Sequence, residues 1–240
     1  MDKKFKNIIN VFEEEKNNLY VSIKKFKEEI KFLNRIGFLY QYFIKTIEDY
    51  PKEKVPILQM FYSCFKNFYI STELILKTHI PEAYTIISRS AEAVALARKF
   101  SKHPEIMNAW LKSKKNKKFI DKYGKLFPKE DSFLYPEIYN IYNLTSNYGR
   151  HQNFESTIFF TDTSNLNNNI INFNFSYIDD ERNLKQFINY LIYCYLKFLE
   201  IFNEIFKENL NKKYLQEFNI LKNNFNLYKK SLLNLFKRKV

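Results

Sequence analysis

Two arginine–histidine pairs have residue types and spacings that suit acid–base chemistry beside an anion. Arg98 is followed five residues later by His103, and Arg150 directly precedes His151. Histidine titrates near neutral pH, so it suits a general acid or base, and arginine binds phosphate or carboxylate through several N–H donors. On a helix, Arg98 and His103 would lie about 140° apart, so a joint role requires the helix to end between them, and Pro104 favours such an end. The same residues also suit a basic helix C-terminus that satisfies the last carbonyl groups.

A polar row accompanies the second pair. Asn147 and His151 are four residues apart and share one face of a helix expected over residues 136–151. Ser146 and Arg150 lie beside that row. The pattern predicts either the wall of a polar site, with His151 as acid or base and Arg150 as anion binder, or a solvated helix face in an Asn-rich protein.

Arg89 and Glu92 are the two charges in the middle of the least charged helical stretch, residues 81–102. No charged side chain lies between Glu82 and Arg89, or between Glu92 and Arg98. A helix that is apolar nearly all round belongs in a core, so we expect this helix at the centre of the molecule. Arg89 and Glu92 are three residues apart and share a face. They predict either an ion pair that braces the core or an arginine held to bind a phosphate or carboxylate.

Other site chemistries lack a sequence signal. The histidines are His79, His103 and His151, and the chain contains no His-x-x-x-His or Cys-x-x-Cys pair, so we expect no metal site. The three glycines are isolated and no Gly-x-Ser-x-Gly turn occurs, which argues against a phosphate-binding glycine loop and a triad hydrolase. We therefore predict neither a metal nor a cofactor.

The composition favours long helices and a cationic protein. With 240 residues, 18% of them aromatic, and only 3 Gly and 6 Pro, the chain has material for a large core but little for turns. The formal net charge of +13 predicts a polyanionic partner, most simply nucleic acid. Codon usage is the alternative explanation, because Lys, Asn, Ile, Phe and Tyr have AT-rich codons and are all abundant here.

Cellular location is predicted from what the chain contains. Cys64 and Cys194 each lie in an apolar helical run and are expected to be buried small hydrophobes of a reducing compartment. The first residues have no apolar signal-peptide core, and no run reaches the ~18–20 apolar residues of a membrane span. We expect a soluble cytoplasmic protein without a transmembrane segment.

The elements that must position these residues form an all-α helical bundle with a small β-hairpin insertion. Four–three apolar spacing over residues 5–47 predicts one long helix or two collinear ones, with Gly37 as the weak point. The same spacing after residue 179 predicts two long helices paired as an antiparallel hairpin. We expect a single helical domain over residues 1–240, with these parts: an N-terminal long helix (1–50), core helices (56–151), a β-hairpin with strands at 156–160 and 170–177 (156–177), and a C-terminal α-hairpin (179–240).

The central helix and its surroundings resemble those of bacterial HEPN-like domains. The resemblance lies in an Arg-x-x-Glu pattern at Arg89 and Glu92, a His-Pro pair at His103, and a later Ser … His element at Ser146 and His151. Uncharacterised domains of this group carry the same succession of short motifs.

The resemblance covers about residues 56–151 together with the long helix after residue 179. It implies a helical bundle, often dimeric, in a superfamily rich in RNA-cutting toxins and defence proteins. Active members use an Arg-x(4–6)-His motif for metal-independent RNA cleavage, and Arg98 and His103 match that spacing. The chain departs from the pattern because Lys99 stands where Asn, Asp or His usually follows the arginine.

Two functions follow as expectations. The first is an RNA-directed HEPN-like protein. As an endoribonuclease it would move the 2′-hydroxyl proton with His103 or His151 and stabilise the phosphorane charge with Arg98 or Arg150. The second is a non-catalytic helical interaction module, which would bind a protein partner or a second copy of itself through its heptad seams.

Overall fold

The protein is an all-α bundle, which confirms the predicted fold class at that level. The structure is a computed structural model, and it describes residues 8–47, 52–112, 135–149, 161–162, 172–173 and 181–237. Its helices are α1 (Ile8–Lys25), α2 (Lys27–Thr46), α3 (Val55–Leu76), α4 (Ile80–Lys102), α5 (Pro104–Lys112), α8 (Pro136–Gly149), α10 (Glu181–Ile205) and α11 (Lys212–Lys237). Two single 3-10 turns, η1 (Lys52–Lys54) and η3 (Lys207–Asn209), precede α3 and α11.

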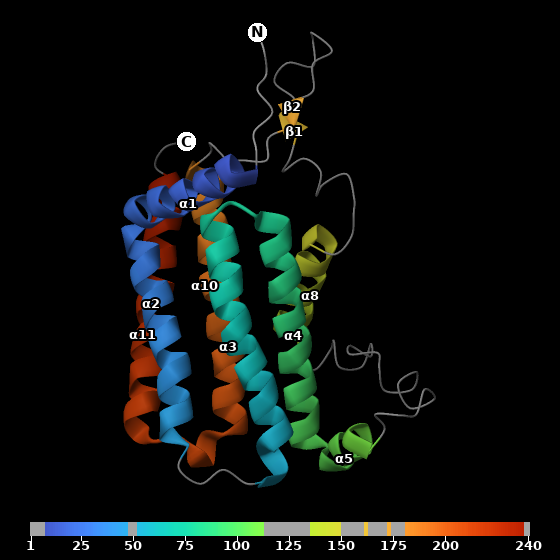
Figure 1. The fold of residues 1–240 in the computed structure, drawn as a ribbon. Coiled ribbons are helices and arrows are strands. Elements are labelled where there is room, and N and C mark those ends of the chain that lie inside the picture. Colours follow the sequence, from blue (N-terminus) through green and yellow to red (C-terminus); the bar gives the residue numbers. More distant parts are fainter. Residues whose placement is uncertain are drawn as a thin grey trace.

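The long helices α2, α3, α4, α10 and α11 lie side by side, as Figure 1 shows. Helix α1 crosses one end of this group, α8 packs along α4, and α5 lies at the opposite end (Figure 1). Helix α4 packs against α3, α8 and α10, so it is central, as its low charge predicts.

The N-terminal helix bends where the sequence does not predict a bend. The chain leaves α1 and enters α2 at Phe26 (φ −102°, ψ 47°), and α1 then lies across the bundle instead of in line with α2 (Figure 1). The expectation of collinear helices with a weak point at Gly37 was wrong. Phe26 is buried in the core, and its N–H still donates to the Ser22 carbonyl at 2.9 Å. The apolar seam therefore continues through the bend, because the side chain of Phe26 at the bend is buried in the core.

Aromatic side chains fill the interior. The rings of Phe43 and Phe61 stack with centroids 4.1 Å apart, and Phe61 meets Phe202 edge to face at 5.1 Å. All three are fully buried, and burying such a side chain stabilises the fold by about 1.5–3 kcal/mol. Cys64 and Cys194 are buried and free, which confirms their predicted role as small hydrophobes.

The last two helices form an antiparallel pair joined by η3 (Figure 1). Side chains that bridge them include Tyr214, whose hydroxyl donates to Asn203 Oδ1 at 2.9 Å. The four–three seam of α10 is buried from Leu184 to Phe202, as its spacing predicts, and Ile205 at its end is half-buried. Its buried members include Leu184, Ile188, Leu191, Tyr195, Phe198 and Phe202.

A β-hairpin of the expected extent is not seen among the described residues. They contain a two-residue antiparallel pairing, β1 (Thr161–Asp162) with β2 (Asn172–Phe173). The first strand lies just after the expected strand at 156–160, and the second lies inside the expected strand at 170–177. The remainder of both expected strands, including 156–160, falls outside the part of the chain that the structure describes.

Candidate functional site

Arg89 and Glu92 lie at the surface and not in the core. Helix α4 packs against α3, α8 and α10, and the strip that carries these two residues faces a pocket beside the first turns of α3. The pocket has a volume of about 300 Å³, and Trp110 of α5 also lines it. Arg89 is exposed and Glu92 is half-buried, so the expectation of core charges was wrong. No ion pair joins the two side chains within the described structure, and Glu92 has another interaction.

Arg98 is held between α8 and α10. Its guanidinium stacks on Tyr135 with Cζ 3.6 Å from the ring centroid, and Nη2 lies 3.2 Å from Glu204 Oε2. A cation over an aromatic face is attracted by the ring quadrupole, and the carboxylate neutralises the charge. Arg98 therefore fastens α4 to the start of α8 and the end of α10.

A chain of charges continues from this position. Lys197 lies 2.8 Å from Glu137 and 3.1 Å from Glu200, and Lys222 of α11 also binds Glu200. Burial by itself raises the pKa of Glu200, but the hydrogen bonds from Lys222 and Lys197 outweigh it, and the net pKa is lowered from 4.5. Burial likewise lowers the pKa of Lys197, and the hydrogen bonds to Glu137 and Glu200 reverse this to a net rise. The network is balanced internally and offers little net charge to a ligand.

His103 lies at the junction of α4 and α5. Its carbonyl accepts a hydrogen bond from the Ile106 N–H at 3.0 Å, and its exposed ring places Nδ1 3.2 Å from Glu105 Oε1. Arg98 instead contacts Glu204 and Tyr135. The described contacts therefore give the two residues separate partners and do not join them in one site.

Helix α8 places its polar residues on different sides. Ser146 is buried and Asn147 is exposed, and Asn147 has an interaction of its own. Arg150 and His151 lie outside the described residues. The helix ends against α4 at Gly149, whose carbonyl accepts a hydrogen bond from Thr85 Oγ1 at 2.8 Å.

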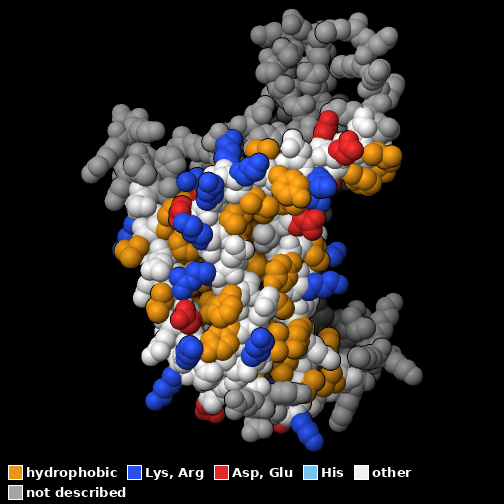
Figure 2. Space-filling view, turned by 60° about the vertical axis from the view of Figure 1, so that its left-hand side comes forward, with side chains coloured by type: hydrophobic (Ala, Val, Ile, Leu, Met, Phe, Trp, Pro, Cys, Tyr) orange, Lys and Arg blue, Asp and Glu red, His pale blue; other side chains and the backbone are white. Residues whose placement is uncertain are grey.

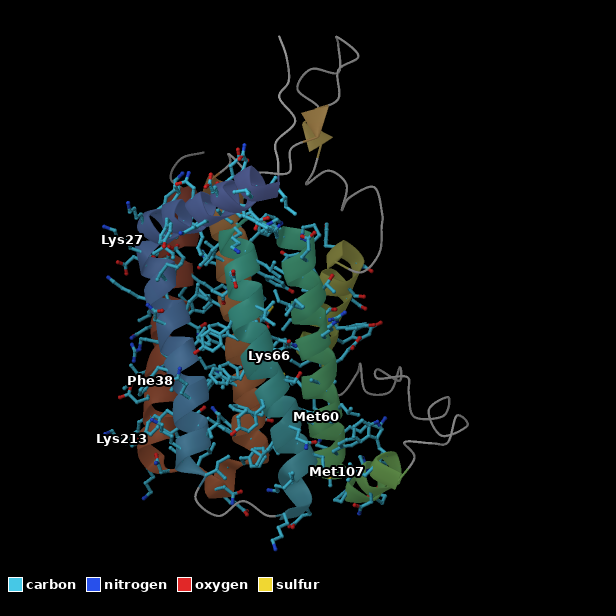
Figure 3. The ribbon with its side chains drawn as sticks, viewed as in Figure 1. Lys27, Phe38, Met60, Lys66, Met107 and Lys213 are labelled. Atoms are coloured by element: carbon cyan, nitrogen blue, oxygen red, sulfur yellow. The ribbon has the colours of Figure 1, made fainter. Side chains whose placement is uncertain are left out.

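A surface of exposed aromatic rings and lysines lies on the neighbouring helices α2, α3 and α11, and the sequence interpretation missed it. We call it the cationic aromatic face. Gln41 Nε2 joins α2 to α3 by donating to the Tyr69 hydroxyl at 3.0 Å. Figure 3 shows Phe38 and Lys213 along one outer edge of the bundle, with Lys66 on the adjacent α3. The face consists of Phe38, Tyr42, Lys45, Tyr62, Lys66, Tyr69 and Lys213, of which Tyr42 is half-buried and the others are exposed.

The charge of the cationic aromatic face is not neutralised. Three carboxylates on the same three helices are ion-paired with other cations, Glu28 with Lys31, Glu73 with Lys77, and Glu217 with Arg35. The three lysines of the face form no ion pair with any described residue. Figure 2, turned toward the side of α2 and α11, shows blue cationic side chains among orange hydrophobic ones, with few red acidic ones. The surface therefore offers free ammonium groups beside solvent-exposed rings.

A sequence signal for this face exists in hindsight. Lys31, Phe38 and Lys45 are seven residues apart, off the apolar seam of their helix, and Tyr62, Lys66 and Tyr69 are spaced four and three. An aromatic ring off the seam has no place in the core. Because the face also depends on α11 lying beside α2, the spacing alone could not assemble it.

The chain gives no match when compared with protein-family models, with curated proteins or with solved structures. None of the described helices combines the length and apolar character that a membrane span requires. Within the same residues, no cluster of His, Cys, Asp and Glu side chains is arranged to hold a metal ion. The candidate site therefore rests on the geometry of this chain alone.

Proposed function

We propose that this protein is an RNA-directed helical protein of HEPN-like type that binds single-stranded RNA through the cationic aromatic face. The observation that carries the proposal is the combination of exposed rings on α2 and α3 with three lysines that no described carboxylate neutralises. Phe38, Tyr62 and Tyr69 are 55%, 50% and 46% exposed. Exposed rings leave apolar surface in contact with water, which is unfavourable. A base stacked on such a ring would remove that surface from water.

Single strands suit such a surface better than duplexes do. An unpaired base can stack on an aromatic ring, and each such stack contributes about 1–3 kcal/mol. Lysines between the rings attract the phosphates and release counterions, which adds affinity that falls with salt. The resemblance of the region around Arg89 and Glu92 to HEPN-like domains favours RNA over other polyanions.

Binding, not cleavage, is what the described contacts support. Arg98 is stacked and ion-paired, and His103 contacts Glu105, so this pair supplies no assembled acid–base site. An endoribonuclease would then depend on Arg150 and His151, which lie beyond the described ranges.

Lysine substitutions test the proposal. Fluorescence anisotropy with a labelled single-stranded uridine oligonucleotide would compare the wild type with a Lys45→Gln, Lys66→Gln, Lys213→Gln variant. We expect a loss of affinity, and we expect the negative slope of log K against log salt to become shallower by about 2, since each lost phosphate contact removes about 0.7 on a single strand.

The matched control removes three exposed lysines elsewhere. Its substitutions are Lys24→Gln on α1, Lys52→Gln in η1 and Lys207→Gln in η3, which change the net charge equally. The control should bind like the wild type. Equal losses in both variants would mean that net charge alone attracts RNA, and absence of binding by the wild type would contradict the proposal outright.

Self-association through α1 is a second proposal, carried by a different observation. Helix α1 crosses the end of the bundle with Ile8, Ile9 and Phe12 68%, 62% and 59% exposed. Clustered exposed apolar side chains are typical of interaction surfaces. We expect light scattering to give a dimer mass for the wild type and a monomer mass for Ile9→Glu, Phe12→Glu, and a wild-type monomer at every concentration would contradict this.

A further inference from the structure

The groove between α2 and α11 forms part of the cationic aromatic face and combines aromatic and charged side chains. It has a volume of about 510 Å³ and lies where the two helices run side by side, and this size is typical of sites for small organic groups. Its lining comprises Phe38, Gln41, Tyr42 and Lys45 of α2 with Lys213 and Glu217 of α11.

The groove offers an accessible ring on a fixed support. The Phe38 and Tyr42 rings lie 5.5 Å apart at an interplanar angle of 41°, and Tyr42 packs edge-on against the buried Tyr214 at 5.8 Å. Tyr42 is thus anchored to the core, while Phe38 is open to solvent. A flat ligand could stack on Phe38 without displacing any core side chain.

Glu217 gives the groove a carboxylate, which the residues of the cationic aromatic face lack. Its Oε2 lies 3.3 Å from Arg35 Nη2, on the neighbouring helix, which holds the carboxylate at the α2–α11 boundary. A carboxylate has two oxygens and about four acceptor positions, so one ion pair leaves capacity for a ligand. The ammonium groups of Lys45 and Lys213 supply donors in the same groove.

We propose that this groove holds one unstacked guanine base of the bound RNA, an inference that rests on the proposed function. Guanine presents two adjacent N–H donors on one edge, which suit the Glu217 carboxylate, and acceptors O6 and N7 on another, which suit a lysine. Uracil has a single N–H donor, and adenine and cytosine each have only an amino group to offer the carboxylate. The phosphates on either side of the base would lie near Lys45 and Lys213.

The test uses short uridine oligonucleotides that differ only in their central base. Anisotropy titrations of the full chain would compare central guanosine, adenosine, cytidine and uridine. We expect guanosine to bind about tenfold more tightly than uridine, as one good bidentate base contact provides. Guanosine monophosphate should compete with the guanosine oligonucleotide and uridine monophosphate should not, and equal competition by both would overturn the proposal.

Two substitutions separate direct recognition from groove structure. Glu217→Gln replaces the carboxylate by a neutral amide and should remove the guanine preference while uridine binding remains. Arg35→Gln breaks the same ion pair but keeps the carboxylate, so it should retain the preference. A preference that persists in Glu217→Gln, or that disappears equally in both variants, would overturn the proposal.

The outcomes distinguish this inference from the proposed function. If the wild type binds all four oligonucleotides equally, the guanine site is excluded and RNA binding stands. If it binds none of them, RNA binding itself is excluded. Both changed side chains are partly exposed (Arg35 43%, Glu217 39%), so we expect both variants to fold, and thermal unfolding of each would check this.

Discussion

In the described structure Arg98 holds helices together through its contacts with Tyr135 and Glu204, although its spacing from His103 fits a nuclease motif. Its stack on Tyr135 and its ion pair with Glu204 both disappear in Arg98→Ala. We expect the free energy of unfolding to fall by about 1–2 kcal/mol, the size of a partly desolvated cation–π contact with an ion pair. Arg98→Lys should recover only part of this, because an ammonium group lacks the planar stack.

The measurement for Arg98 combines chemical denaturation with the RNA titration. Stability should fall in Arg98→Ala while RNA affinity stays the same. A variant of unchanged stability that loses RNA binding or cleavage would assign Arg98 to the site instead.

Glu200 predicts a pH dependence of stability. Lys222 and Lys197 hold its folded pKa below the ordinary 4.5, so the unfolded state binds its proton first as the pH falls. Its contribution is therefore fully present above about pH 5 and is lost as the pH drops through the folded pKa. Urea unfolding of wild type and Glu200→Gln from neutral to acidic pH should show a difference that shrinks toward low pH, and a constant difference would contradict the assignment.

At the scale of elements, the contact of α8 with α4 depends on the absence of a side chain at Gly149. A Cβ there would lie 2.4 Å from the Thr85 backbone nitrogen and 2.8 Å from the Pro81 carbonyl oxygen. Because both neighbours are backbone atoms, Gly149→Ala must push the helices apart. We expect it to destabilise the fold by about 1–3 kcal/mol.

Gly37→Ala is the matched control within α2. Its Cβ would meet only the Phe68 and Tyr69 side chains, at 3.4 Å, and alanine favours helix over glycine by about 1 kcal/mol. Urea unfolding should give a neutral or slightly stabilising effect. A destabilisation equal to that of Gly149→Ala would show that the α8–α4 contact is not special.

Helix positions could be predicted from the sequence better than helix directions could. Four–three spacing locates α2, α10 and α11, because it reports which residues are buried. It shows that Phe26 belongs to the core but not which helices cover it, so the bend between α1 and α2 could not be predicted. Arg89 was misplaced for a related reason, since composition shows that a helix is buried but not which strip of it stays open.

The same limit applies to the candidate site. Phe38 and Lys45 are neighbours on one helix and their shared face follows from spacing. Lys213 and Glu217 join them only because α11 lies beside α2, a contact between distant parts of the sequence. Tertiary packing, and not a local motif, therefore makes the groove.

At the scale of the whole molecule, the net charge of +13 can be interpreted from which lysines form ion pairs and which do not. Codon usage can enrich lysine everywhere, but it does not explain why Lys45, Lys66 and Lys213, which form no ion pair with a described residue, share a surface with exposed aromatic rings. The distribution of charge, more than its sum, supports an anionic ligand.

The most direct test of RNA binding through this face removes the rings and keeps the charges. It measures the affinity of the wild type and of Phe38→Leu, Tyr62→Leu, Tyr69→Leu for a labelled uridine oligonucleotide. The control, Phe12→Leu, Tyr20→Leu, removes rings that are 59% and 54% exposed on α1. Leucine stays apolar but cannot stack, so we predict an affinity lower by at least about tenfold in the first variant and unchanged affinity in the control. Equal affinities of the wild type and the first variant, with both proteins folded, would contradict the account.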